Sequence, residues 1–155
     1  GSREVEIVGV ELTGREGSPA RVFASGDPVD IHMRVRANTP MRDCVFGVGL
    51  FNSDGVCCYG TNTHIEGAAT GEVTGEGEAR FSIERLDLVA GTYKLDVAVH
   101  RENGVPYDYH RLLYTFRVTS PLREVGVFRP PHRWSFSGDI HMPLAEPAID
   151  RSVEG

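Results

Sequence analysis

The stretch from Cys44 to Asn62, CVFGVGLFNSDGVCCYGTN, constrains the fold most strongly. Its two halves flank the tetrapeptide NSDG, which is typical of a tight turn because its glycine tolerates positive φ. The alternation on either side predicts a β-hairpin with strands at 44–51 and 56–61. One face of the first strand holds Phe46, Val48 and Leu50, and the other holds Val45, Gly47, Gly49 and Phe51. We expect the first face to pack in a core, whereas the second has no side chains at its centre.

The composition favours a single, mainly β domain. The chain has 155 residues, 18 glycines, nine prolines and a formal net charge of −6, and no apolar segment approaches the roughly 20 residues of a membrane span. The negative charge disfavours nucleic acid, which normally selects basic patches. Three cysteines, two of them adjacent, make a poor disulfide framework and favour a reducing cytoplasm. Residues 1–2, Gly-Ser, are typical of a tag scar, so we expect an excised fragment.

Further alternating segments predict the remaining strands. They lie at 5–13, 29–37, 79–84, 93–99 and 107–118, with a short extended piece at 21–24. The glycine-rich stretch 66–78 predicts a long loop. The Gly91-x-Tyr93 step resembles the tyrosine corner of immunoglobulin-type sandwiches, in which the phenol bonds the backbone at a bend. Seven strands without a helix-period segment therefore predict an all-β, immunoglobulin-like antiparallel β-sandwich.

The C-terminal part after residue 118 is rich in proline and has little periodicity. The run Val125-Gly126-Val127-Phe128 is a candidate edge strand, and Trp134 has an apolar area large enough to need burial. A second subunit would provide that burial. We therefore expect a domain over residues 3–136 and an extended or disordered tail over 137–155.

Common enzyme signatures are missing. The sequence has no G-x-x-x-x-G-K-[ST], G-x-S-x-G, H-E-x-x-H or Cys-x-x-Cys motif. His64 and Glu66, together with His100 or His110, are candidates for a cupin-like metal site. Solvated surface histidines are the ordinary alternative. We predict no catalytic residue, metal or cofactor.

The outer face of the predicted hairpin sheet is a candidate binding surface. If the hairpin pairs with 93–100 and 107–118, alternation places small residues at the centre of this face and polar or aromatic ones around it. The candidate carbohydrate-binding residues are Gly47, Gly49, Tyr59, Asp96, His100, Tyr109 and Arg111. Sugars stack on aromatic rings and bond carboxylate and guanidinium groups through their hydroxyls. The alternative is a solvated sheet face whose glycines relieve crowding.

Several motifs resemble one known family. They are GDPVDI at 26–31, FGVGLFNSDG at 46–55, YGTNT at 59–63, LxLxxGxYxL at 86–95 and GVFRPPHRW at 126–134. In combination they are similar to the C-terminal carbohydrate-binding domain of Wzt-type ATPases, the ATP-binding subunits of ABC transporters that export O-antigen polysaccharide. The resemblance covers about residues 3–134.

The resemblance implies a function and partners. Such domains bind O-antigen polysaccharide without catalysis, often at its non-reducing end, and dimerise by exchanging C-terminal strands. It therefore implies a homodimer in which Val125, Val127, Phe128 and Trp134 cross to the partner. It also implies a transmembrane permease partner through a missing ATPase domain, and a cytoplasmic location peripheral to the inner membrane. A generic immunoglobulin-like protein-interaction domain remains the alternative.

Overall fold

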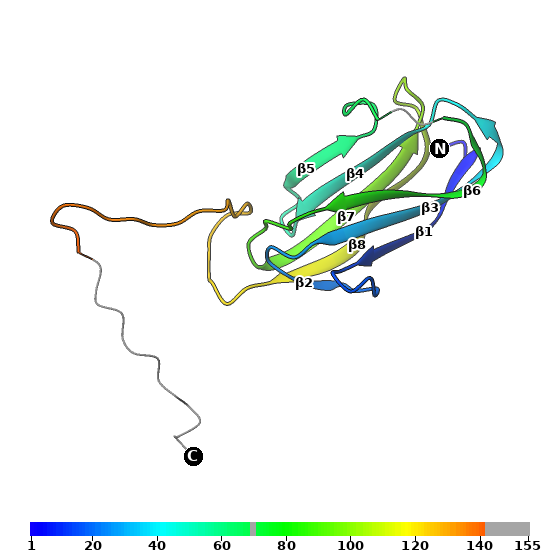
Figure 1. The fold of residues 1–155 in the computed structure, drawn as a ribbon. Helices are drawn as coiled ribbons and strands as arrows, with labels where there is room; N and C mark the ends of the chain where they lie inside the picture. The colour runs from blue at the N-terminus through cyan, green and yellow to red at the C-terminus, as the bar shows by residue number, and fades with distance from the viewer. Residues whose placement is uncertain (69–70, 142–155) are drawn as a thin grey trace, which may run out of the picture.

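The computed structural model describes residues 1–68 and 71–141. The strands among these residues form two packed β-sheets (Figure 1). The three-stranded sheet has the order β1 (Val5–Thr13), β3 (Val29–Met41), β6 (Val73–Ile83). The five-stranded sheet has the order β2 (Val22–Ala24), β8 (Pro106–Thr119), β7 (Gly91–His100), β4 (Val45–Asn52), β5 (Cys57–Asn62). All pairs are antiparallel except β2 with β8. The predicted all-β sandwich is confirmed.

The core lies between the two sheets and follows from alternation along the strands. Ile31 and Met33 on β3 and Leu95 and Val97 on β7 are each at most 2% exposed. Their sequence neighbours point to the outer faces, because successive strand residues alternate between faces. Within the described residues, no helix has the length and apolar character that crossing a membrane requires.

The predicted tyrosine corner is present at the start of β7. The hydroxyl of Tyr93 donates a hydrogen bond to the carbonyl of Val89 at 2.6 Å, and the Tyr93 ring stacks on Phe116 with 5.7 Å between centroids. This bond holds the connection that leads into the central strand of the larger sheet. The predicted pairing of the hairpin with β7 and β8 is also confirmed, because β7 lies between β4 and β8.

The prediction of a long loop over the glycine-rich stretch 66–78 is wrong for its second half. Residues 73–78, expected within a loop, belong to β6 and pair with β3, for example Gly77 with Val35. β6 is the outermost strand of its sheet, and most of its N-terminal half is exposed. An exposed edge strand needs no regular apolar alternation, so the sequence pattern did not reveal it.

Within the described residues, the chain after β8 contacts the sandwich through residues 127–129. Phe128 forms an isolated bridge with Leu88, and the Val89 amide donates to the Val127 carbonyl at 2.7 Å. The described residues that follow run away from the sandwich (Figure 1). The predicted tail at 137–155 falls largely on residues 142–155, which lie outside the described residues.

Candidate functional site

A hollow of about 200 Å³ opens on the outer face of the five-stranded sheet. Its floor is formed where Gly47 on β4 pairs with Ala98 on β7 and with Asn62 on β5. A Cβ at Gly47 would make only ordinary contacts, with its nearest atoms at 3.6 Å, so the glycine leaves this part of the floor without a side chain. Five of the seven predicted site residues line this hollow. They are Gly47, Gly49, Asp96, His100 and Tyr109.

Asp96 is the most unusual of these residues, because it lies on an outer face and is yet only 6% exposed. Its carboxylate occupies the space next to Gly49, where any side chain would collide with Oδ1. Oδ2 accepts a hydrogen bond from the Tyr109 hydroxyl at 2.6 Å. Oδ1 is buried and has no hydrogen-bond partner within the described part of the chain. The site thus contains a buried acceptor atom that its own surroundings do not satisfy.

Tyr109 stands beside Asp96 on β8 and is 49% exposed. The hydrogen bond to Asp96 raises the pKa of the Tyr109 phenol above its ordinary value, and burial and the Asp96 charge act in the same direction. The guanidinium of Arg111 opposes this rise in pKa, so it lies within electrostatic range of the phenol. Tyr109 therefore stays neutral at physiological pH, with its ring held against the hollow by a charge-assisted bond.

Arg111 itself does not line the hollow. The pairing of β7 with β8 is interrupted at Asp96. There, the three residues 111–113 of β8 lie opposite the single residue Asp96 of β7, which forms a β-bulge. Leu112 within this bulge has a φ of 49°, which is uncommon for a residue with a side chain. Such bulges redirect neighbouring side chains. The bulge places Arg111 on the exposed surface of β8 outside the hollow.

His100 lies at the opposite end of the hollow from Phe51, four positions along β7 from Asp96. Its Nδ1 is 2.7 Å from the carbonyl oxygen of Arg101. A carbonyl oxygen only accepts hydrogen bonds, so Nδ1 carries the proton in this arrangement. In the neutral ring, Nε2 is then an acceptor.

The predicted position of Tyr59 in this site is corrected by the register of the hairpin. Tyr59 pairs with Leu50, whose side chain is buried in the core, and the next pair is Cys57 with Phe51. The unpaired Cys58 between them reverses the alternation, so Tyr59 does not share a face with Gly47 and Gly49. Tyr59 is absent from the hollow's lining.

Phe51 takes the place that the sequence assigned to Tyr59. Its ring carbon Cε2 lies 3.0 Å from where a Cβ of Gly49 would be, so the ring leans over the same glycine that makes room for Asp96. Strand alternation had placed Phe51 on this face. Asn62 also lines the hollow, and its Oδ1 accepts the Ile65 amide at 2.7 Å, which closes the turn after β5.

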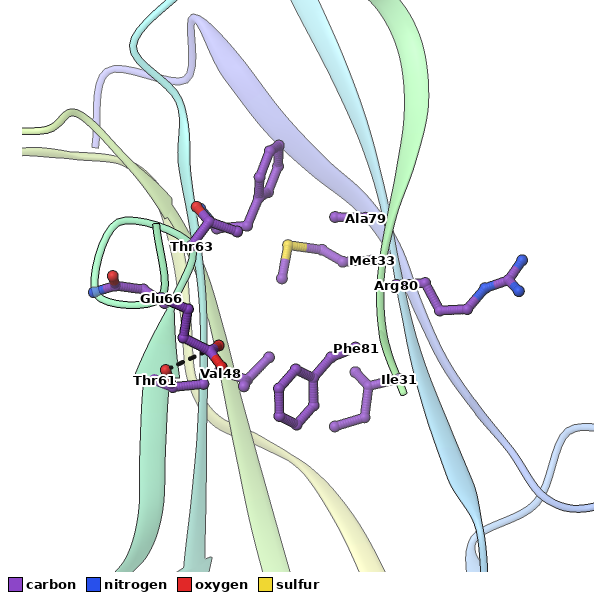
Figure 2. Close-up of a pocket in the computed structure, with 11 residues that line it drawn as sticks. Ile31, Met33, Val48, Thr61, Thr63, Glu66, Ala79, Arg80 and Phe81 are labelled. Atoms are coloured by element: carbon purple, nitrogen blue, oxygen red, sulfur yellow. Dashed lines mark hydrogen bonds between the residues drawn. The ribbon is translucent and has the colours of Figure 1, made fainter. Parts of the chain in front are cut away.

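A second, smaller pocket lies between the sheets at the open side of β5 and β6 (Figure 2). Ile31, Val48 and Phe81 point toward one another inside it, whereas Arg80 points away (Figure 2). Its volume of about 70 Å³ is smaller than the about 200 Å³ of the outer hollow, and both lie below the roughly 300–1,000 Å³ of ordinary ligand pockets. This pocket is an opening into the apolar core, and Thr61, Thr63 and Glu66 add polar groups to its lining.

The candidate metal residues do not come together. Glu66 accepts a hydrogen bond from the Thr61 hydroxyl at 3.1 Å, at the mouth of the pocket in Figure 2. His64 lines a different surface depression, and His100 faces the outer hollow. Among the residues that the structure describes, no group of three or more histidines, cysteines and carboxylates could hold a metal ion.

Comparison with known proteins assigns the chain to a family. Residues 1–130 match the Wzt C-terminal domain family. The chain belongs to this family. The O-antigen export system ATP-binding protein RfbB of Myxococcus xanthus is 32% identical to the chain over 130 residues, which are 84% of this chain and 29% of RfbB. The chain thus spans less than a third of that relative.

Solved structures support the same fold. The crystal structure of the C-terminal domain of wzt matches with a TM-score of 0.77 and 20% identity, covering 88% of this chain and 86% of that one. Part of the Pseudomonas fluorescens alkylpurine DNA glycosylase AlkC matches with a TM-score of 0.50 and 14% identity, over 77% of this chain and 32% of AlkC. At these identities, both likenesses concern the fold alone.

The hollow of this Wzt C-terminal domain combines groups suited to binding. Two aromatic side chains, Phe51 and Tyr109, flank the buried carboxylate of Asp96, and the imidazole of His100 is a further polar group. Aromatic rings bind the C–H faces of a sugar, and carboxylate oxygens accept its hydroxyl protons.

Proposed function

We propose that the outer hollow binds O-antigen polysaccharide, at the non-reducing end of the glycan. The observation that carries this proposal is the buried Asp96 carboxylate between Phe51 and Tyr109, in a member of the Wzt C-terminal domain family. Because Gly47 has no side chain, the floor of the hollow leaves room for a sugar ring. Affinity is expected to be about micromolar to millimolar, because a shallow hollow buries little of a ligand.

In this proposal the chain recognises its ligand and catalyses nothing. It serves an O-antigen exporter as the substrate-recognition part of an ATP-binding protein, in keeping with its similarity to RfbB. The ATP-binding domain of the longer protein contacts the transmembrane permease, and the recognition domain lies on the cytoplasmic side of the membrane.

The proposal extends to a homodimer built by the C-terminal segment. Val125 is 94% exposed, Phe128 66% and Trp134 79%, which leaves a large apolar area uncovered in one chain. The contacts of Val127 and Phe128 with residues 88–89 are the contacts that an exchanged segment would make with a partner. Two hollows in one dimer raise the effective affinity for a long glycan.

The binding proposal is tested by titrating the isotope-labelled chain with O-antigen polysaccharide from its source organism. NMR shifts are expected at Gly47, Asp96, His100 and Tyr109. Tyr109→Ala and Tyr59→Ala form a matched pair, because the two side chains are 49% and 52% exposed and only Tyr109 lines the hollow. We expect Tyr109→Ala to weaken binding about tenfold and Tyr59→Ala to leave it unchanged. Absence of any shift with the polysaccharide would refute the proposal.

A further inference from the structure

The hollow has an unbalanced charge. Of the described residues that line it, Asp96 alone carries a formal charge at neutral pH. Its single hydrogen bond comes from the neutral phenol of Tyr109, and no ion pair reaches Asp96 from the described part of the chain. A negative charge therefore lies in the wall of the hollow without a salt-bridge partner among the described residues.

Two cationic side chains on this face, Lys94 and Arg111, are in a different environment. Lys94 lies two positions from Asp96 on the same strand, and Arg111 lies in the bulge of β8. Both side chains are exposed and lie outside the lining of the hollow. Water and salt screen such exposed charges, whereas a buried charge is screened much less. The field inside the hollow is therefore dominated by Asp96.

A field of this sign discriminates between ligands. It repels carboxylate, phosphate and sulfate groups, and it attracts the partial positive charge of hydroxyl hydrogens and the full charge of an ammonium group. The buried Oδ1 has no hydrogen-bond donor within the described part of the chain, so hydrogen bonding neutralises little of the negative charge of Asp96.

We infer that Asp96 is a specificity residue, which makes the hollow accept neutral or amino-bearing sugar units and reject units that carry a negative charge. The inference rests on the proposed function, because it concerns which glycans the same hollow binds. Asp96 acts on the ligand through its electric field, so the ligand need not displace the side chains that cover Oδ1.

The test uses oligosaccharides that differ only in the group at C6 of the terminal sugar, which is neutral in one probe and negatively charged in its partners. Probes ending in glucose, galactose or mannose are compared with the same probes ending in the matching uronic acid or hexose 6-phosphate. Kd is measured from the NMR shifts of Tyr109 and His100. We expect each neutral probe that binds to do so at least about tenfold more tightly than its acidic partners.

Asp96→Asn removes the charge at nearly constant shape, and its amide oxygen can still accept the Tyr109 hydroxyl. We expect this variant to bind the acidic probes more tightly and to reduce the neutral-to-acidic ratio of Kd values to within about threefold. Lys94→Gln, a control at an exposed cation, should not alter the direction of the preference.

The outcomes separate the two proposals. If the wild-type hollow binds acidic probes as tightly as neutral ones, the charge selection is wrong while glycan binding stands. A ratio that persists in well-folded Asp96→Asn would also overturn the role of Asp96. If neither these probes nor the O-antigen polysaccharide shifts any residue of the hollow, the proposed function fails, and the inference fails with it.

Discussion

Gly49 and Asp96, direct partners on β4 and β7, share one volume: the carboxylate of Asp96 fills the space that a side chain at position 49 would need. This arrangement allows an acidic side chain to lie flat against the outer face of the sheet. It explains why Asp96 is only 6% exposed although its neighbours on that face, Lys94 and Ala98, are not buried. The glycine is therefore required by the site's carboxylate rather than by backbone conformation.

Gly49→Ala is expected to lower the free energy of unfolding by about 1–3 kcal/mol, because the new methyl group collides with Asp96 Oδ1 and crowds the Phe51 ring. Gly47→Ala is the matched control on the same strand and face, and its methyl group would have no contact closer than 3.6 Å. We expect Gly47→Ala to be neutral or slightly stabilising, since glycine weakens a strand. Urea unfolding of both variants measures the difference.

A double variant checks the cause of the Gly49→Ala effect. Because Asp96→Ala removes the colliding atoms, Gly49→Ala should cost less in that background than in the wild type. Equal costs in both backgrounds would mean that the carboxylate is not what position 49 must avoid.

Tyr109→Phe is expected to destabilise the fold by about 1–3 kcal/mol, because both oxygens of the buried Asp96 carboxylate would then lack a donor. Tyr59→Phe provides the comparison, since the Tyr59 hydroxyl has no hydrogen-bond partner in the described residues and the ring is half exposed. Its effect should stay within about 0.5 kcal/mol. Thermal or urea unfolding of the two variants measures their free energies of unfolding. Equal losses of stability in both would contradict the role given to the Tyr109–Asp96 hydrogen bond.

The sequence was informative wherever alternation ran without interruption. β1, β4 and β7 lie within one or two residues of their predicted bounds, and Gly47 and Gly49 lie on the outer face that alternation assigned to them. Alternation failed at the bulge around Cys58, because one extra residue reverses every side chain beyond it. No residue type at that position indicates a bulge. The sequence pattern therefore offered no reason to choose Phe51 over Tyr59 as an aromatic residue that lines the hollow.

Burial of individual polar groups was also beyond the sequence pattern. From alternation alone, Asp96 is predicted to be an exposed residue on the outer face of its strand. Its burial depends on the Tyr109 hydroxyl from another strand and on the Phe51 ring, both of which come from tertiary packing. The β8 bulge, which places Arg111 outside the hollow, has the same origin.

Stability is expected to fall in alkaline solution because of Tyr107. Burial and a hydrogen bond to Asp43 raise the pKa of this phenol above the ordinary tyrosine value of about 10. The folded protein thus holds the proton more tightly than the unfolded chain, so this stabilisation is complete below about pH 10 and is lost as the pH rises from there toward the folded pKa.

Urea unfolding between about pH 8 and about pH 11 measures this loss. Tyr107→Phe cannot ionise, so its free energy of unfolding should fall less steeply over the same range, whatever its value at neutral pH. The Tyr109 phenol, whose pKa is also raised, accounts for part of the remaining slope. A slope unchanged by Tyr107→Phe would place the alkaline sensitivity elsewhere.

Truncation after Ser120 tests the proposed dimer. The cut removes Val127 and Phe128 together with the bonds that they and Arg129 make to residues 87–89, and it uncovers Leu88. We expect the full chain to be a dimer in light scattering and the truncated chain to be monomeric or insoluble, because an apolar edge is left unpaired. Truncation after residue 141 is the control, since it keeps Trp134 and the whole candidate segment and should leave the dimer intact. A stable dimer after the Ser120 cut, or a monomeric full chain, would show that residues 125–136 do not build the interface.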